Sequence, residues 1–144
     1  MKIKVDTKEK FQVLRPEEPE LSVIMADDIV KIVTQGFGSE AKNAIIDMTQ
    51  VAEADEQALV ELATLLQLCQ KNQASFVFFG VSPRVKSAMQ GLDLIDVFQL
   101  TPTESEAWDI VQMEEIEREL FGDDFEQNDN EDMDEPSLDD SELG

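Results

Sequence analysis

The sequence predicts a single α/β domain with a mostly parallel β-sheet of about four to five strands, helices mainly on one face, and a disordered acidic tail. Short apolar runs of strand length alternate with segments whose apolar residues recur at helical spacing. The run SFVFFGV at residues 75–81 is apolar throughout, as expected for a strand covered on both faces in a parallel sheet. The stretch 122–144 holds eleven acidic residues and no basic one, with too little apolar surface to offset the entropy cost of ordering. We therefore predict a domain at residues 1–121 and a tail at 122–144.

The first predicted elements are two short strands, KIKVD at residues 2–6 and FQVLR at 11–15, joined by the polar turn TKEK. The segment RPEEPE then ends the strand pattern. Residues 25–35 are predicted to be helical, because three branched side chains fall on one face at helical spacing: Ile29, Ile32 and Val33. A further strand is predicted at residues 44–48.

The clearest helix in the sequence covers residues 55–72. One side of this helix collects apolar side chains, namely Ala58, Leu59, Leu62, Leu65, Leu66 and Cys69. It lies between the strands at 44–48 and 75–81, so the three elements form a βαβ unit, for which a right-handed crossover is expected.

The last third of the domain continues the alternation. Ser82 and Pro83 supply an N-cap and a first helical residue, and Gly91 ends a helix of about two turns. A last strand is predicted near residues 98–100. Thr103 and Glu106 form a capping box ahead of a long C-terminal helix, whose apolar residues are Ala107, Ile110, Val111 and Leu120.

Composition restricts the possible partners and the compartment. The 144 residues include 33 acidic and 11 basic ones, which gives a net charge of -22 that repels nucleic acid and anionic lipid. Basic or apolar protein partners are expected instead. The single Cys69 excludes a disulfide framework within the chain. No segment has the length and apolarity of a signal peptide or a membrane span, so we expect a cytoplasmic protein without membrane insertion.

The order of elements and several motifs resemble the STAS domain family, the sulfate transporter and anti-sigma factor antagonist domain. Residues 47–51, Asp-Met-Thr-Gln-Val, match the family's strand end Asp-Leu-Ser-x-Val; Asp55 matches its turn aspartate, and Leu59 and Leu62 match the start of its helix. A second set of matches follows at Gly80-Val81-Ser82-Pro83, Val85, Gly91-Leu92 and Phe98. The resemblance covers about residues 1–120 and implies a STAS-like single domain that binds a protein partner.

The sequence departs from the family pattern at the turn before the helix. The family's Ser-Ser-Gly is replaced by Glu56-Gln57-Ala58, so the serine that is phosphorylated in bacterial anti-sigma antagonists falls on Gln57. An amide cannot accept a phosphoryl group, so no modification is expected at Gln57. The nearest hydroxyls belong to Thr49 and Thr64.

Two interpretations of the acidic turn remain open. Asp55 can cap the helix and Glu56 can interact with the positive end of its dipole, effects worth about 1 and about 0.3 to 1 kcal/mol. Alternatively, the turn is a recognition surface, because the resemblance implies that this helix start faces the partner. The candidate partner-binding residues are Glu53, Asp55, Glu56, Gln57 and Val60.

Little in the sequence supports catalysis, a cofactor or a metal. The chain has no histidine, the commonest general base, and Cys69 falls among the leucines of an apolar helix face. Gly36-Phe37-Gly38 follows a helical pattern and is interpreted as a helix stop. Acids at residues 129–134 offer oxygens to calcium, but this stretch lacks the glycine and terminal glutamate of a calcium loop.

The predicted function is a protein-interaction regulatory module of the anti-anti-sigma type, not an enzyme, whose partner is an anti-sigma factor or kinase-like protein. The alternative is a soluble STAS subunit of an ABC-type lipid transport complex, in which the partner is a transport ATPase. The oligomeric state stays open at this point.

Overall fold

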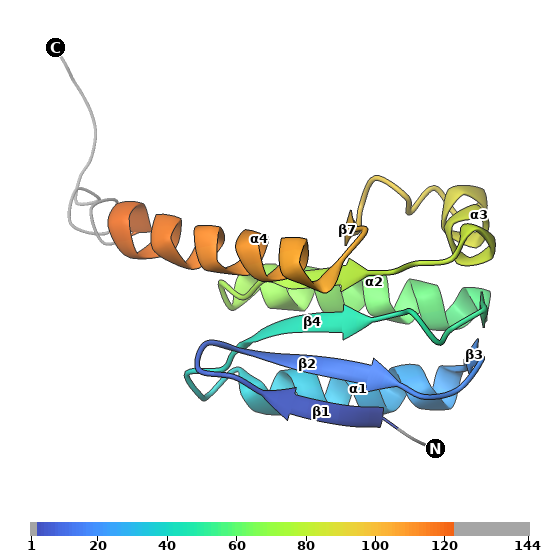
Figure 1. Ribbon diagram of the computed structural model, residues 1–144, viewed down its shortest axis with the longest axis horizontal. Helices are drawn as coiled ribbons and strands as arrows, with labels where there is room; N and C mark the ends of the chain where they lie inside the picture. The colour runs from blue at the N-terminus through green and yellow to red at the C-terminus, as the bar shows by residue number, and fades with distance from the viewer. Residues whose placement is uncertain (1–2, 123–144) are drawn as a thin grey trace, which may run out of the picture. The chain divides into compact units, whose positions relative to one another are not determined.

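A computed structural model describes residues 3–122 of the chain, with side chains to residue 120. In this part, five strands form one sheet in the order β1-β2-β4-β6-β7, with β1 at one edge (Figure 1). β1 is antiparallel to β2 and every other neighbouring pair is parallel. The strands are β1 Ile3–Thr7, β2 Phe11–Pro16, β4 Asn43–Asp47, β6 Phe76–Phe79 and β7 Gln99–Thr101. The predicted mostly parallel sheet with one edge strand of opposite sense is confirmed.

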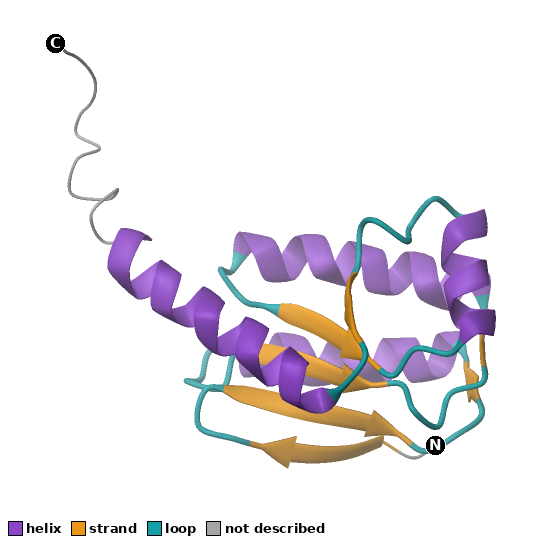
Figure 2. Cartoon of the chain, turned by 45° about the horizontal axis from the view of Figure 1, so that its top comes forward, coloured by secondary structure: helices purple, strands orange, loops and turns teal. Residues whose placement is uncertain are grey.

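Two helices, α1 Val23–Gly36 and α2 Glu56–Lys71, lie side by side along one face of the sheet (Figure 2). Adjacent strand residues point to opposite faces, so Leu14, Ile46 and Phe78 pack in the core beneath these helices. All six apolar residues predicted for α2, from Ala58 to Cys69, are buried there. The predicted βαβ unit β4-α2-β6 is present.

The opposite face of the sheet carries a smaller core. Val13, Ile45 and Val77 pack there with Ala107 and Val111 from the first turns of α4, which spans Glu104–Glu117. Trp108, also in α4, packs edge-on against Phe11 at 5.1 Å between ring centroids. The first turns of α4 therefore cover the face that α1 and α2 leave free.

The predicted helix caps are in place. The Asp55 side chain accepts a hydrogen bond from the backbone N–H of Gln57, and Ser82 caps α3 Pro83–Gly91 by accepting from Val85. Thr103 accepts from the N–H of Glu106 at the start of α4. Ser22, which the sequence analysis did not single out, caps α1 in the same way and starts it two residues earlier than predicted.

Two very short strands are additions to the predicted order. β3 Glu20–Leu21 and β5 Glu53–Ala54 form a separate parallel pair ahead of α1 and α2. Each strand has two residues, and β3 follows a segment with two prolines. Neither strand is long enough to show an alternation of apolar and polar residues in the sequence. The segment RPEEPE, expected only to end a strand, leads directly into this pair.

The chain divides into two compact units, Met1–Val111 and Gln112–Gly144. The second unit contains the last turns of α4 and a π-helical turn, η1 Arg118–Gly122, with an ion pair of 3.3 Å between Arg118 and Glu115. Leu120 lies in this turn and is exposed rather than part of an apolar face of a regular helix. The predicted boundary at residue 121 stays a prediction, because the tail lies outside the described residues.

Candidate functional site

Residues 53–60, which comprise β5, the cap Asp55 and the first residues of α2, are defined here as the α2 turn, and its start is held by backbone bonds to the segment before α1. The N–H groups of Ala52 and Glu53 both donate to the carbonyl of Pro19, and that of Asp55 donates to Leu21 at 2.9 Å. Ser82, at the start of α3, donates its hydroxyl to the carbonyl of Ala52. These bonds fix the backbone at the start of the α2 turn.

All five predicted partner-binding residues lie on the surface of the α2 turn. Glu53, Asp55, Glu56, Gln57 and Val60 are each exposed. The Asp55 carboxylate is the helix cap, so the structural interpretation holds for this residue. Val60 leaves 48% of its surface exposed although it is apolar. The structure thus presents these five side chains together, while their role in binding is not tested by it.

A further exposed apolar residue, Ile24, lies in the first turn of α1. Ile24 has 65% of its surface exposed, although it is a large apolar residue. Just before it in the chain, Leu21 of β3 accepts the backbone N–H of Asp55, and one turn after it Asp27 lies near enough to Glu61 of α2 to raise the pKa of that carboxyl. An exposed isoleucine therefore lies in the first turn of the helix that packs against α2. Ile24 precedes the helix predicted from the sequence, so the helical pattern does not single it out.

The charge around the α2 turn is strongly acidic. The pKa of Glu61 lies above its ordinary value. The largest cause is the interaction of its carboxyl group with that of Asp27, followed by burial and by the repulsion between the two charges. Arg84 pairs with Glu53 at 3.1 Å between Nη1 and Oε2, but both side chains are largely exposed and such a pair stabilises little. The exposed surface of the α2 turn is therefore mainly acidic and includes one apolar side chain, that of Val60.

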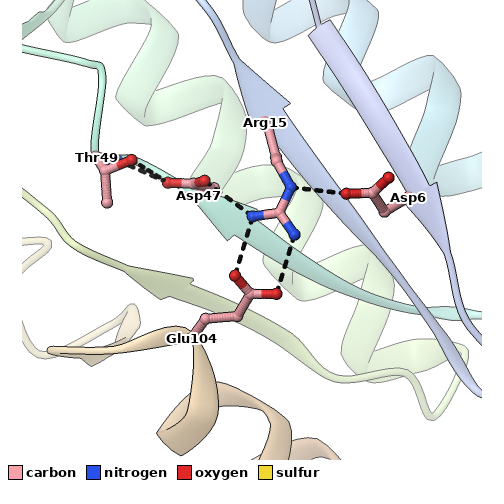
Figure 3. Close-up of polar contacts among 5 residues, drawn as sticks. All are labelled: Asp6, Arg15, Asp47, Thr49 and Glu104. Carbon is pink, nitrogen blue, oxygen red and sulfur yellow. Dashed lines mark hydrogen bonds and ion pairs between the residues drawn. The ribbon is translucent and has the colours of Figure 1, made fainter.

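A second polar constellation lies at the carboxyl ends of β2 and β4 (Figure 3). Arg15 donates from Nε to Asp6 at 2.8 Å, from Nη1 to Asp47 at 3.0 Å, and from both Nη atoms to Glu104 at 3.0 Å. One guanidinium therefore joins β1, β2, β4 and the start of α4. We call these four residues the Arg15 cluster.

The Arg15 cluster shifts the titration of its members. Hydrogen bonds from Arg15 hold the pKa values of Glu104 and Asp6 below their ordinary values, against the opposing effect of burial. The hydrogen bond to Glu104 in turn raises the pKa of Arg15. No signal in the sequence revealed this cluster, since Arg15 and Glu104, for example, are 89 residues apart.

The Arg15 cluster also reaches the loop that leads to the α2 turn. Thr49 donates its backbone N–H and its hydroxyl to Asp47 Oδ1, at 2.9 and 2.6 Å (Figure 3). Gly80 has φ of +69°, and a Cβ at this position would lie 2.5 Å from the methyl group of Thr49. Glycine at residue 80 therefore allows β6 to end directly against Thr49.

The other candidates for chemistry do not form a site. Cys69 is buried, and burial raises the pKa of its thiol to about 12, so the nucleophilic thiolate is strongly disfavoured. Gly36 ends α1, as expected for a helix stop. Among residues 3–122 no group of three potential ligands is placed to hold a metal, and no helix is long and apolar enough to cross a membrane. The calcium candidate at residues 129–134 lies outside the described residues.

One family model matches most of the chain. A family model described as the STAS domain matches residues 2–107. No curated protein sequence matches the chain. The family match covers the whole sheet, α1 to α3, and the start of α4.

Solved structures share the fold at low sequence identity. A Thermotoga maritima protein described as an anti-sigma factor antagonist gives a TM-score of 0.66 at 19% identity, covering 76% of this chain and 94% of that chain. The anti-sigma factor antagonist SpoIIAA in its unphosphorylated form gives 0.64 at 19% identity, covering 77% and 96%. A murine anion transporter of solute carrier family 26 gives 0.60 at 15% identity, covering 74% of this chain and 18% of that chain.

Proposed function

The chain belongs to the STAS domain family, and we propose that it is a protein-interaction regulator of the anti-anti-sigma type, which binds its partner through the α2 turn and is not switched by serine phosphorylation there. The observation that carries the proposal is the exposed, acidic and partly apolar surface of the α2 turn, fixed by backbone bonds to the segment before α1. The likeness to anti-sigma factor antagonists supports it.

The chemistry of the α2 turn favours binding over catalysis. Its side chains are carboxylates, an amide and branched apolar groups, and they stand on the surface rather than in a closed cleft. A fixed carboxylate at Glu56 carries one negative charge, whereas a phosphoserine carries about −1.5 to −2. The proposed partner therefore meets a constant, moderate negative charge at this residue.

We expect no stoichiometric phosphate on Thr49 or Thr64. Each hydroxyl is already a donor within the fold, Thr49 to Asp47 and Thr64 to the carbonyl of Val60. A phosphate on Thr49 would lose this bond and place about two negative charges beside the Asp47 carboxylate. Phosphopeptide mapping of the chain purified from its native cells measures this. Full occupancy of either threonine would mean that the phosphorylation switch is relocated rather than lost.

Affinity capture from native cells tests the proposed function. The bait is the full chain, compared with the variant Glu56→Lys and with the charge-matched control Glu40→Lys, an exposed acid beyond the C-terminal end of α1. We expect mass spectrometry to identify an anti-sigma factor or kinase-like protein that is retained by the wild type and the control and depleted with Glu56→Lys. Equal recovery with all three baits would contradict binding through the α2 turn.

The second candidate function is a soluble subunit of an ABC-type lipid transport complex. The likeness to part of a murine anion transporter supports it, because this fold also occurs within a transport protein. The same capture experiment separates the two candidates. Retention of a transport ATPase in place of an anti-sigma factor would favour the transport role and leave the α2 turn as the candidate contact surface.

A further inference from the structure

Within the described residues, the outer edge of β1 carries a row of backbone groups that no other strand pairs. β1 is the first strand in the sheet order, and no described element pairs with it on the side away from β2 (Figure 1). Such an edge is a template for a further strand, and proteins usually protect it with charges, bulges or a covering element.

The hairpin register shows which residues face outward. Lys8 donates to the carbonyl of Phe11 at 2.7 Å, and the β1–β2 pairing keeps this register, with Lys4 opposite Arg15 and Asp6 opposite Val13. Hydrogen-bonded pairs alternate along an antiparallel ladder. The N–H and C=O groups of Lys4 and Asp6 therefore point to β2, whereas those of Ile3, Val5 and Thr7 point to the open edge.

The side chains at this edge are only partly covered. Val5 stands opposite Leu14, a core residue on the face of α1 and α2, yet 39% of its surface is exposed. A groove of about 350 Å³ separates β1 from α1 and is lined by Ile3, Asp28, Lys31, Ile32 and Gln35. α1 thus leaves both the backbone edge of β1 and its apolar side chains accessible.

We infer that this edge pairs with the same edge of a second copy of the chain, forming a two-fold dimer with one continuous sheet. The two β1 strands run antiparallel with Val5 opposite Val5 of the second copy. In this register Ile3 faces Thr7 of the second copy, and the outward backbone groups of all three residues are paired. Lys4 then stands opposite Asp6 of the second copy, twice by symmetry, at the closer, non-hydrogen-bonded positions of the ladder.

The charges of β1 select this register over its neighbours. A shift of the two-fold centre to Lys4 or to Asp6 would place like charges opposite each other, which is destabilising. A lysine on an edge strand usually discourages pairing. In the register centred on Val5, however, Lys4 stands opposite Asp6 of the second copy and attracts it. Asp6 uses its Oδ2 atom to bind Arg15, and its second carboxylate oxygen can accept from Lys4 of the second copy. Bases outnumber acids in residues 3–15, so the large net negative charge of the chain is not concentrated at this edge.

Sedimentation velocity of the full chain in physiological salt, over a hundredfold range of concentration, tests the dimer. We expect a concentration-dependent shift from monomer to dimer. Hydrogen exchange at the same concentrations should show growing protection of the amides of Ile3, Val5 and Thr7, while those of Lys4 and Asp6 stay protected throughout. A monomer at every concentration would overturn the proposal. The outer edge of β1 would then be a candidate site for an extended segment of another protein.

Two variants of one residue test the register. Lys4→Glu places acids opposite Asp6 in both symmetry-related pairs, and we expect the dissociation constant of the dimer to rise at least about tenfold. The hairpin itself is kept, because an acid at this position faces Arg15 across β1 and β2. Lys4→Arg keeps the charge and should dimerise like the wild type. Equal dissociation constants for the two variants would overturn this interface.

Discussion

Replacing Leu62 with alanine is expected to lower the free energy of unfolding by about 2 to 5 kcal/mol, the range for truncating a buried leucine. Leu62 is fully buried on the inner side of α2, in the larger of the two cores. The substitution removes its packing contacts and leaves a cavity that the surrounding helices and strands fill only in part. Chemical denaturation followed by circular dichroism measures the loss.

The matched control for Leu62→Ala is Gln67→Ala. Gln67 lies on the outer face of the same helix and is exposed, so its replacement should change stability by no more than about 0.5 kcal/mol. A loss of similar size in both variants would mean that α2 does not pack on the sheet through the face described here.

Replacing Arg15 with methionine is expected to cost about 2 to 3 kcal/mol of folding stability. Removing one partner of a buried ion pair costs about 3 to 5 kcal/mol, and the lower figure allows for the partial exposure of the Arg15 cluster, in which Arg15 itself is 23% exposed. Without the guanidinium, the carboxylates of Asp6, Asp47 and Glu104 lose their shared counter-charge. Arg15→Lys keeps the charge but not the bidentate geometry, so it should fall between the wild type and Arg15→Met.

The Arg15 cluster also predicts a pH dependence with a definite sign. Because Arg15 lowers the pKa values of Glu104 and Asp6 in the fold, their contribution to stability is complete above the ordinary values of 4.5 and 3.8 and is lost as the pH falls through the lowered values. Arg15→Met should lose this part of the acid dependence. Parallel stability curves for the wild type and Arg15→Met between neutral pH and pH 3 would contradict the assignment.

The sequence predicted those features of the fold that depend on local patterns. The apolar side of α2 and the caps Asp55 and Ser82 follow from helical spacing and from side chains that accept backbone N–H bonds. The buried run at β6 follows from its unbroken apolar composition. Each of these signals lies within about twenty residues of chain.

The features that the sequence did not predict depend on contacts between distant residues. The Arg15 cluster joins residues 6, 15, 47 and 104, and nothing near any one of them indicates the others. The strands β3 and β5 are stabilised by pairing with each other rather than by their own composition. Ile24 lies outside the predicted helix, and its exposure at the start of α1 depends on how α1 packs in the fold. The role of the α2 turn was predicted through the family resemblance, and its exposure agrees with that role without testing it.

Titration of the purified partner against the wild type, Glu56→Lys and Glu40→Lys tests most directly whether the α2 turn is a recognition surface. The reversal at Glu56 changes a favourable helix-dipole interaction into an unfavourable one, a stability change on the order of 1 kcal/mol, so the fold should be kept. We predict that Glu56→Lys binds at least about tenfold more weakly, equivalent to about 1.4 kcal/mol, while Glu40→Lys binds like the wild type and both variants still unfold cooperatively. If the affinity for Glu56→Lys is unchanged and only its stability falls, the acids of the α2 turn are structural and the account of binding is wrong.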